Sequence, residues 1–574
     1  MSSSHRLRRR LQSETSLVPF NPGAPLRVVL AYPNTYAVGM SNLGVQTLYR
    51  LLNARPEVCC ERLFLPDAEQ LARFPRRSAL LPSLETQRPV INADLLALSV
   101  SFENDYPNLL TLLALAGLPL RASERGEEYP LVAMGGATVS INPEPVAPFV
   151  DLCCIGEGEE LVEPLVEALL GHHQRRTLLE KLCTVPGFYV PSLYQPSYGD
   201  EHATSRPHGD VPPFVGLTPQ APAPATIRKV RATFGGVESV AATSVLSPET
   251  QFGDRAMIEV ARGCTKGCRY CWVGYNILPF RVHAVDDILA VAEQWRQQTE
   301  RVGLVATALL DHPEIVTIAE GLRGRGFAVF SPSLIISTLQ EPLLRAVIES
   351  GQKSITIAPE TGSDRLRQLI MKKISNEEIL EKVRMLFRTG AHSLKCYIII
   401  GLPGETEADL GDLIDLAAQM QAIMVDEGRA RGSIGTITLS VNCLIPKPGT
   451  PFQWVEQIRP QVYRAKLRWL RRRIAHLPNV SLEAMSPRSA EVQGVLSRGD
   501  RRVAALLEQL FRCGSWSQAV RRWESEGGSL AHFAYRAYAP TEPLPWAHLR
   551  IGASPTALQN QWQRALKIDV GAAA

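Results

Sequence analysis

Three cysteines stand close together in the segment ARGCTKGCRYCWVGY, which covers residues 261–275. Cys264, Cys268 and Cys271 follow a C-x3-C-x2-C spacing, and Tyr270 comes directly before the last of them. Thiolates are the usual ligands of zinc and of iron–sulfur clusters. Three cysteines could also form one disulfide and a free thiol, or serve as small buried side chains. The chemistry of this segment therefore depends on what surrounds it.

A structural zinc site or a disulfide fits this spacing poorly. Structural zinc sites use four ligands, commonly two C-x2-C pairs or a cysteine pair with a histidine pair. The nearest histidine, His283, lies twelve residues beyond Cys271 and has no second histidine beside it. A disulfide would leave one thiol over and is rare in reducing compartments. Three thiolates can instead hold three irons of a 4Fe–4S cluster and leave the fourth iron open to a small molecule.

The composition indicates a large globular protein from a reducing compartment. The 574 residues are enough for roughly three or four domains. Lys and Arg exceed Asp and Glu by only 61 − 57 = 4, which by itself predicts neither a nucleic-acid nor a membrane partner. No apolar run reaches ~18 residues, so no membrane span is predicted. Eleven cysteines without a secretory leader favour a cytoplasmic location.

Two local stretches are strongly basic, residues 5–10 and residues 464–473. The second carries Leu467, Leu470 and Ile474 at helical spacing, which favours an amphipathic helix with a solvated basic face. Binding of RNA or phosphate by that face is the less favoured alternative.

The N-terminal part alternates short apolar runs with helical patterns, after a tail at residues 1–24 that is predicted to be disordered. Strands are predicted at residues 26–32, 95–101, 130–136 and 150–158, with helices around residues 45–52 and 109–115 and directly after residue 158. Strands that alternate with helices predict a doubly wound, Rossmann-like parallel sheet over residues 25–170.

Prolines separate this part from a second α/β region. They are dense between residues 186 and 224, which excludes long helices and predicts a connecting region of loops or short edge strands at residues 171–250. Residues 251–455 predict a partial (β/α)6 barrel of the TIM type. Its strand candidates are residues 256–261, 303–310, 327–335, 354–359, 393–401 and 436–444. Residues 456–574 are predicted to form a helical C-terminal region.

The segment CTKGCRYC resembles the signature of the radical S-adenosylmethionine (SAM) superfamily, a C-x3-C-x2-C with an aromatic residue before the third cysteine. It follows the first predicted barrel strand, where that superfamily has it. The resemblance implies that Cys264, Cys268 and Cys271 ligate a 4Fe–4S cluster whose open iron chelates SAM. It also implies reductive cleavage of SAM to a 5′-deoxyadenosyl radical, with the electron supplied by a reductant such as flavodoxin or ferredoxin.

Predicted SAM contacts lie at the ends of the barrel strands, where active sites of such barrels form. They are Tyr270, Ser333, Glu360, Gly401, Gly404 and Asn442. Glu360, in APETGSDRLR, is expected to accept hydrogen bonds from the ribose hydroxyls; capping of the next helix is its alternative role. GLPGETEADL resembles the superfamily's glycine-containing turn beside adenine. DHPE after the second strand lacks the glycines that the superfamily often has there, and Asp311 or His312 could reach the pocket instead.

Residues 133–160 resemble the last part of the cobalamin-binding domain that precedes many radical SAM barrels. The resemblance implies cobalamin at the carboxyl edge of the N-terminal sheet, where open α/β sheets bind ligands. The implied contacts are Ser99, Ser101, Gly135 and Gly136. The loop at residues 33–44 lacks the Asp-x-His-x-x-G that would supply an axial histidine, so cobalamin without a histidine ligand is expected. A domain that has lost the cofactor is the alternative.

Taken together, about residues 25–515 resemble a subgroup of radical SAM proteins with an N-terminal cobalamin-binding-like domain, whose substrate the resemblance does not fix. The prediction is a radical SAM enzyme, with cobalamin-dependent methyl transfer to an unactivated carbon as one reaction. The alternatives are an iron–sulfur sensor or electron-transfer protein and, ranked lower, a tRNA methylthiotransferase. The last would need a second cluster, for which the N-terminal half offers only Cys59–Cys60, Cys153–Cys154 and Cys183.

Overall fold

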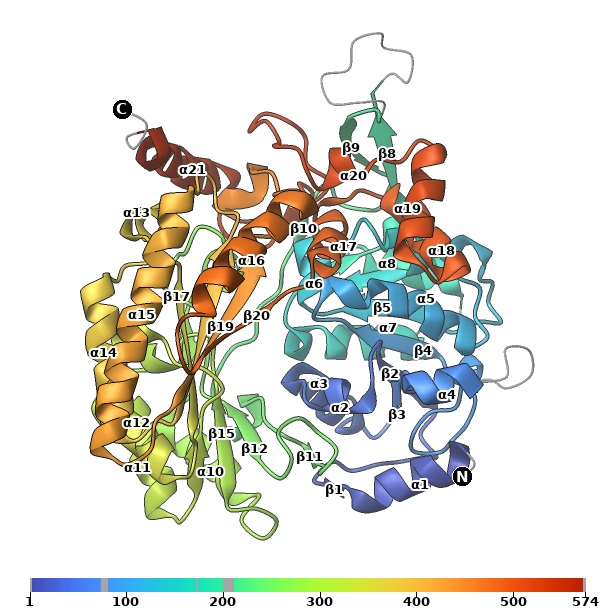
Figure 1. The fold of residues 1–574 in the computed structure, drawn as a ribbon. Helices are drawn as coiled ribbons and strands as arrows, with labels where there is room; N and C mark the ends of the chain where they lie inside the picture. The colour runs from blue at the N-terminus through green and yellow to red at the C-terminus, as the bar shows by residue number, and fades with distance from the viewer. Residues whose placement is uncertain (1–2, 74–80, 172–173, 200–210, 571–574) are drawn as a thin grey trace.

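Two parallel α/β units lie side by side, and helices of the C-terminal region extend over both (Figure 1). The computed structural model describes residues 3–73, 81–171, 174–199 and 211–570. Residues 1–2 of the predicted tail and residues 172–173 and 200–210 of the predicted connecting region lie outside the described residues. The mixed α/β architecture with parallel strands and a mainly helical C-terminal region confirms the predicted fold class.

The N-terminal unit is a sheet of six strands in the order β3-β2-β4-β5-β6-β7. These are β2 (Leu26–Tyr32), β3 (Val58–Phe64), β4 (Leu95–Ser99), β5 (Leu131–Gly135), β6 (Leu152–Cys154) and β7 (Phe188–Tyr189). The first five are mutually parallel, and β7 is antiparallel to β6. The parallel strands have the 2-1-3-4-5 order of flavodoxin-like sheets, which bind ligands at the carboxyl edge where the strand order reverses. That point lies between β2 and β4.

Helices cover both faces of this sheet, which explains why β2 is apolar along most of its length. Leu30 belongs to the core on one face and Ala31 to the core on the other, because successive side chains of a strand point to opposite sides. The helices in these two cores are α3 (Leu43–Asn53), α7 (Val162–Gly171) and α8 (Arg175–Leu182) on the first face, and α5 (Tyr106–Leu115) and α18 (Val503–Cys513) on the second.

Short strands join the two units. They are β8 (Tyr194–Tyr198), β9 (Phe214–Pro219), β10 (Ile227–Arg228) and β11 (Val245–Leu246). Strands β8 and β9 form an antiparallel pair, and β10 pairs with β21 (Leu549–Arg550) from the far end of the chain. The described part of the connecting region beyond residue 186 is therefore built of short strands, single helical turns and loops, as the proline density predicts. Residues 175–182, which lie within the predicted connecting region, instead form α8 and pack on the N-terminal sheet through Leu178 and Leu182.

The second unit is a curved wall of parallel strands in two sheets, β12-β15-β16 and β17-β18-β19-β20. Their bounds are β12 (Ala256–Glu259), β15 (Arg301–Val305), β16 (Ala328–Phe330), β17 (Ser354–Glu360), β18 (Ser393–Ile400), β19 (Thr436–Cys443) and β20 (Val480–Ala484). A main-chain hydrogen bond of 2.9 Å from Leu334 to Thr356 links the two sheets. The outer helices are α10 (Val285–Glu293), α11 (Ile315–Gly324), α12 (Glu341–Glu349), α14 (Asn376–Thr389), α15 (Glu407–Ala430) and α16 (Pro460–Ile474).

Strand β20 corrects the prediction that residues 456–574 are helical throughout. It pairs in parallel with β19 at the edge of the sheet, and its alternate residues Val480, Leu482 and Ala484 pack against the barrel core. The rest of this region is mainly helical, with α17 (Pro487–Arg498), α18, α19 (Trp516–Ser525) and α21 (Pro555–Val570).

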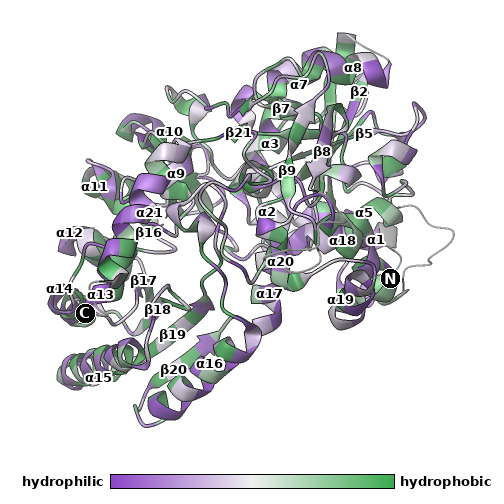
Figure 2. Cartoon of the chain, turned by 90° about the horizontal axis from the view of Figure 1, so that it is seen from above, coloured by the Kyte–Doolittle hydropathy of each residue, from purple (hydrophilic) through white to green (hydrophobic). Residues whose placement is uncertain are grey.

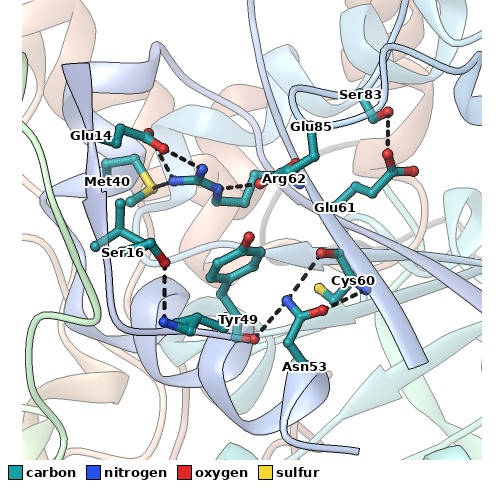
Figure 3. A network of polar contacts seen from close by, with 12 residues as sticks. Glu14, Ser16, Met40, Tyr49, Asn53, Cys60, Glu61, Arg62, Ser83 and Glu85 are labelled. Carbon is teal, nitrogen blue, oxygen red and sulfur yellow. Dashed lines mark hydrogen bonds and ion pairs between the residues drawn. The ribbon is translucent and has the colours of Figure 1, made fainter. Parts of the chain in front are cut away.

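The prediction of a disordered tail is wrong for residues 3–24. They contain α1 (Ser3–Ser13) and β1 (Thr15–Ser16), and β1 pairs antiparallel with β11. The Glu14 carboxylate accepts hydrogen bonds of 2.9 and 2.6 Å from the buried Arg62 guanidinium (Figure 3). A partner nearly fifty residues away holds this segment, which a local pattern could not predict. None of the described helices is long and apolar enough to cross a bilayer.

Candidate functional site

The three cysteines lie in the loop that follows β13 (Ala261–Arg262), just beyond the carboxyl end of β12. Cys264 and Cys268 are each 8% exposed, and Cys271 is half-buried. Gly263 begins the loop with a φ of 101°, and a Cβ there would lie 2.3 Å from the carbonyl oxygen of Ile277. Only glycine fits this close approach without strain, so the local sequence RGC is what folds the loop back on itself.

Hydrogen bonds to sulfur and burial mark the surroundings of the three thiols. The N–H of Lys266 donates to Cys264 Sγ at 3.5 Å, and main-chain N–H groups after Cys271 donate to its sulfur. Burial raises the pKa of all three thiols, that of Cys268 to about 12, with neighbouring Cys271 and Cys264 adding to the effect. Such thiols ionise when a metal displaces the proton. Among the described residues, no three Cys, His, Asp or Glu side chains, the three cysteines included, form a group that could hold a metal ion as they are placed.

Glu360 ends β17 beside the cysteine loop. Its Oε1 accepts a hydrogen bond of 2.6 Å from the Tyr270 hydroxyl and one of 3.1 Å from Lys372 Nζ. Glu360 is 5% exposed and has a φ of 69°, a conformation that costs a residue other than glycine about 1–3 kcal/mol. The structure thus joins two predicted SAM residues and adds Lys372. That lysine lies in MKK, which matches no motif, so only its contact identifies it.

Two further predicted SAM residues share this edge of the barrel sheet. Glu360 pairs with Ile398 across β17 and β18, and Asn442 pairs with Ile399 across β18 and β19. Gly401 follows directly after β18, where its N–H donates to the Glu405 carboxylate at 3.1 Å. Glu360, Gly401 and Asn442 therefore lie at neighbouring strand ends, as the sequence predicts for a common pocket.

The remaining predicted positions are more scattered. Ser333 follows β16 and is exposed, and the Gly404 carbonyl accepts a hydrogen bond of 2.7 Å from an arginine. Asp311 does reach the cysteine loop, because its carboxylate binds Lys266 Nζ at 2.9 Å. The carbonyl oxygen of His283 lies 3.0 Å from His312 Nε2, so this ring nitrogen already has a hydrogen-bond partner.

A cavity of about 400 Å³ lies between the two units. The carboxyl edge of the N-terminal sheet forms one wall, and the segment after Cys271 contributes Trp272 and Val273 to the other. The four residues predicted to contact cobalamin all line it: Ser99, Ser101, Gly135 and Gly136. None of the six predicted SAM residues does. Much of the remaining wall is apolar, from Leu30, Leu48, Leu52, Ala97 and Ala133.

Two buried polar atoms of lining residues have no hydrogen-bond partner among the described residues. They are Thr47 Oγ1 and Trp272 Nε1. Thr47 as a whole residue is 5% exposed. A buried polar atom left unpaired costs about 1–3 kcal/mol, so the cavity suits a ligand that supplies hydrogen bonds. Lys229 also lines the cavity; its Nζ donates to the Asn276 carbonyl at 3.0 Å, and burial lowers its pKa to about 8. None of these three residues is among the predicted ligand contacts, although Trp272 directly follows Cys271.

Packing of the backbone explains why residue 136 is a glycine. Its φ is 108°, and a Cβ there would lie 2.3 Å from the carbonyl oxygen of Val100. The close packing of the ends of β4 and β5, rather than ligand space, excludes a side chain at Gly136. At Gly135 a Cβ would make an ordinary contact of 3.4 Å with Cys154.

A charged cluster at the rim of the cavity ties the two units together. Glu157, which follows β6, accepts hydrogen bonds of 2.6 Å from Arg281 and 2.8 Å from Arg262, both on the barrel unit. Burial opposes ionisation of this carboxyl, but the Arg281 and Arg262 guanidinium groups lower the pKa of Glu157 to about 2.

Glu157→Gln is expected to make the folded protein less sensitive to acid. The folded pKa lies below the ordinary value of 4.5, so the ionised carboxylate contributes its full stabilisation above pH 4.5 and loses it as the pH falls toward 2. Denaturant unfolding at pH 6 and pH 3 should therefore show a smaller loss of stability for E157Q than for the wild type. Glu163→Gln, which removes an exposed carboxylate, should keep the wild-type loss. Equal losses in wild type and E157Q would contradict the assignment.

The fold and the site are of the radical SAM type: a curved wall of parallel strands with a C-x3-C-x2-C loop beyond its first strand. Two family models agree. Residues 44–191 match the model described as radical SAM proteins, N-terminal, and residues 258–417 match that of the radical SAM superfamily. The chain belongs to the radical SAM superfamily. Membership implies a 4Fe–4S cluster and SAM as cofactors.

Curated relatives cover the chain to different extents. An uncharacterised protein of Methanocaldococcus jannaschii is 24% identical over 84% of this chain and 90% of its own length. The ribosomal protein uS12 methylthiotransferase RimO of Pelotomaculum thermopropionicum is 29% identical over 29% of this chain and 40% of that protein. A tRNA-2-methylthio-N(6)-dimethylallyladenosine synthase of Legionella pneumophila is 26% identical over 35% and 45%. The chain thus spans less than half the length of either methylthiotransferase.

Similar solved structures include two cobalamin-associated radical SAM enzymes. The methyltransferase TsrM from Kitasatospora setae, with cobalamin and a [4Fe-4S] cluster bound, has a TM-score of 0.48 at 13% identity, covering 88% of this chain and 100% of that one. OxsB with aqua-cobalamin and SAM bound has a TM-score of 0.44 at 13% identity, covering 96% and 80%. At this level of similarity, the cofactors and substrates of those two enzymes cannot be assigned to this chain.

Proposed function

We propose that the protein is a radical SAM enzyme that also binds cobalamin in the cavity between its two units. The observation that carries the proposal is the composition of that cavity. The carboxyl edge of a flavodoxin-like sheet forms one wall, and the two residues that follow Cys271 belong to the other. When bound, the cluster and SAM supply a 5′-deoxyadenosyl radical, and cobalamin supplies a cobalt centre able to pass a methyl group to an unactivated carbon.

The chain's own groups fit these roles. Thr47 Oγ1 and Trp272 Nε1 are the unpaired polar atoms that a ligand in the cavity would satisfy, and the leucines of the wall would exclude water from it. No histidine is among the described residues that line the cavity. Cobalamin bound there would therefore have no histidine on its lower face, in agreement with the histidine-free loop at residues 33–44.

Loading experiments test the proposal. Protein purified without oxygen would be supplied with iron, sulfide and hydroxocobalamin, and then analysed for cluster iron, retained cobalamin and 5′-deoxyadenosine formed from SAM. We expect all three, and a paramagnetic resonance spectrum of the reduced cobalamin without splitting from an axial histidine nitrogen. Cluster without SAM cleavage would favour the sensor or electron-transfer alternative. SAM cleavage without retained cobalamin would leave hydrogen abstraction as the reaction and remove methyl transfer through cobalt.

Glu360 gives a separate test of SAM binding. We propose that its carboxylate, held by Tyr270 and Lys372, accepts hydrogen bonds from the SAM ribose. Loss of a charge-assisted hydrogen bond costs about 1.5–3 kcal/mol, so Glu360→Gln should weaken SAM binding roughly 10- to 100-fold. Calorimetric titration of the reconstituted protein measures this, and an unchanged cluster absorbance shows that the loop is intact. Unaltered affinity would assign Glu360 the structural role of holding Tyr270 and Lys372.

The methylthiotransferase alternative conflicts with the sheet topology. Cys59 and Cys60 lie on β3, and Cys153 and Cys154 lie on β6. Strands β2, β4 and β5 stand between them, and neighbouring strands are ~4.8 Å apart, so the two pairs are separated by roughly 19 Å. The two pairs therefore cannot share one cluster, and a second cluster would have to combine one pair with Cys183. A reductant of the flavodoxin or ferredoxin type and a cytoplasmic location remain predictions.

A further inference from the structure

A second groove lies outside the cavity and the cysteine loop, between α16 and the turn that leads from β20 into α17. Its volume is about 430 Å³. Its lining residues are Arg464, Leu467, Arg468, Arg471, Ala484, Met485, Ser486 and Pro487. Figure 2 shows α16 alongside β20 at the edge of the molecule, with hydrophilic positions along the helix. The three arginines that line the groove are exposed, so the groove is open to solvent.

The three arginines form one stripe along α16. A helix turns ~100° per residue, so Arg464, Arg468 and Arg471 lie within roughly 60° of one another. The apolar residues that bury the helix against the barrel, such as Leu467 and Leu470, project from a neighbouring face. The stripe is thus set to one side of the buried face, toward the start of α17.

The stripe carries positive charge that the protein itself does not neutralise. Among the described residues, no carboxylate forms an ion pair with any of its three guanidinium groups, and all three arginines are exposed. Other basic residues of the same helix are engaged: Lys466 binds Glu405 at 2.6 Å, and Arg473 lies 4.0 Å from Glu407. The turn of Ser486 and Pro487 brings the N-terminus of α17, the positive end of its dipole, to the same groove.

We propose that this groove binds the phosphates of a nucleic-acid strand. Arg464 and Arg471 are seven residues apart, which is ~10 Å along a helix. A stacked nucleic-acid strand carries one phosphate per ~3.4 Å of axis, and the backbone path between neighbouring phosphates is longer than this rise, so the stripe faces at least two consecutive phosphates. Guanidinium groups bind phosphate oxygens in pairs. This stretch, which the sequence alone assigns to a solvated face, is thereby a binding surface for RNA or DNA backbone.

Other anionic partners match the groove less well. A single free phosphate would engage only part of the stripe. A membrane surface would also need apolar side chains to insert, and none of the lining residues is a large exposed hydrophobic residue. The groove opens at the carboxyl end of β20, and the N–H of Met485 donates to the carbonyl of Val441, next to Asn442, at 3.0 Å. A strand held there would lie at the same edge of the barrel sheet as the predicted SAM pocket.

Binding can be measured without turnover, so its outcome is separate from that of the proposed function. Fluorescence anisotropy of a labelled single-stranded 20-nucleotide RNA would be recorded with full-length protein over a series of salt concentrations. We expect R464Q/R468Q to weaken binding by ~10-fold or more and to lower the magnitude of the slope of log affinity against log salt by about 1.4, since two phosphate contacts are lost and each contributes ~0.7 for a single strand. R472Q/R473Q removes two charges from the same helix outside the groove and should change the affinity less than ~2-fold, because exposed charges that make no direct contact with the strand are screened by salt.

Three results would overturn the proposal. The first is an equal loss of affinity in R464Q/R468Q and R472Q/R473Q, which would show that RNA binding depends only on the net charge of the helix. The second is binding to phosphatidylserine vesicles but not to RNA or to DNA of the same sequence. The third is full competition by millimolar inorganic phosphate at constant ionic strength, which would indicate a site for a small phosphorylated ligand.

Discussion

Cys268→Ala protein, reconstituted without oxygen with iron and sulfide, is expected to lack the absorbance of a 4Fe–4S cluster and to form no 5′-deoxyadenosine from SAM. The three thiols of the loop are the proposed ligands, and a cluster held by only two protein thiolates loses its fixed position beside the SAM pocket. Because the electron for SAM cleavage would come from this cluster, the loss of activity should be complete rather than partial. Absorbance at the cluster band and chromatography of the nucleoside product measure the two effects.

Cys396→Ala is the matched control for this experiment. Cys396 is a fully buried thiol on β18 of the same unit, and burial raises its pKa to about 12, as it does for Cys268. If cluster assembly depends on the loop, the C396A protein keeps both the absorbance and the activity. A Cys268→Ala protein that still cleaves SAM would remove Cys268 from the ligand set.

The barrel strands could be predicted because each is a local apolar run. The structure has a strand at every one of the six predicted positions. The strand β3 could not be predicted in this way, since Glu61 and Arg62 interrupt its apolar pattern. Both are buried by ion pairs with distant residues: Arg27 Nε lies 2.5 Å from Glu61 Oε2, and Glu85 lies 2.7 Å from Arg62 Nε. Long-range pairing of charges therefore decides the structure of this segment.

Contacts between residues far apart in the sequence could not be predicted for the candidate site either. Tyr270 and Glu360 could be named from motifs, because each sits at a strand end or beside a cysteine. Lys372 and Thr47 have no such local mark, and Trp272, although it directly follows Cys271, matches no position to which the resemblance assigns a role. Lys372 reaches Glu360 across twelve residues, while Thr47 and Trp272 line one cavity from two different units. Their roles depend on how the sheets are placed side by side, which no spacing in the sequence expresses.

Arg62→Leu is expected to destabilise the N-terminal unit strongly. The Arg62 guanidinium is 2% exposed and lies between two buried carboxylates, those of Glu14 and Glu85 (Figure 3). Removing one partner from a buried ion pair leaves charge without compensation and typically costs about 3–5 kcal/mol. Denaturant unfolding should show a loss of this size. Arg10→Gln gives the comparison, because the Arg10–Glu249 pair is partly exposed and such pairs contribute about 0–1 kcal/mol.

A second experiment shows which segment of the chain the R62L substitution destabilises. Glu14 belongs to the N-terminal segment that pairs with β11, so in R62L this segment should detach and become accessible to protease near residue 16, while in R10Q it should stay protected. Replacing Glu14 and Glu85 by Gln in the R62L background removes the two unpaired charges and should restore part of the stability, because the neutral amides are less costly to bury. If R62L unfolds like the wild type, or if the double amide replacement lowers its stability further, the buried triad is not what fixes the segment.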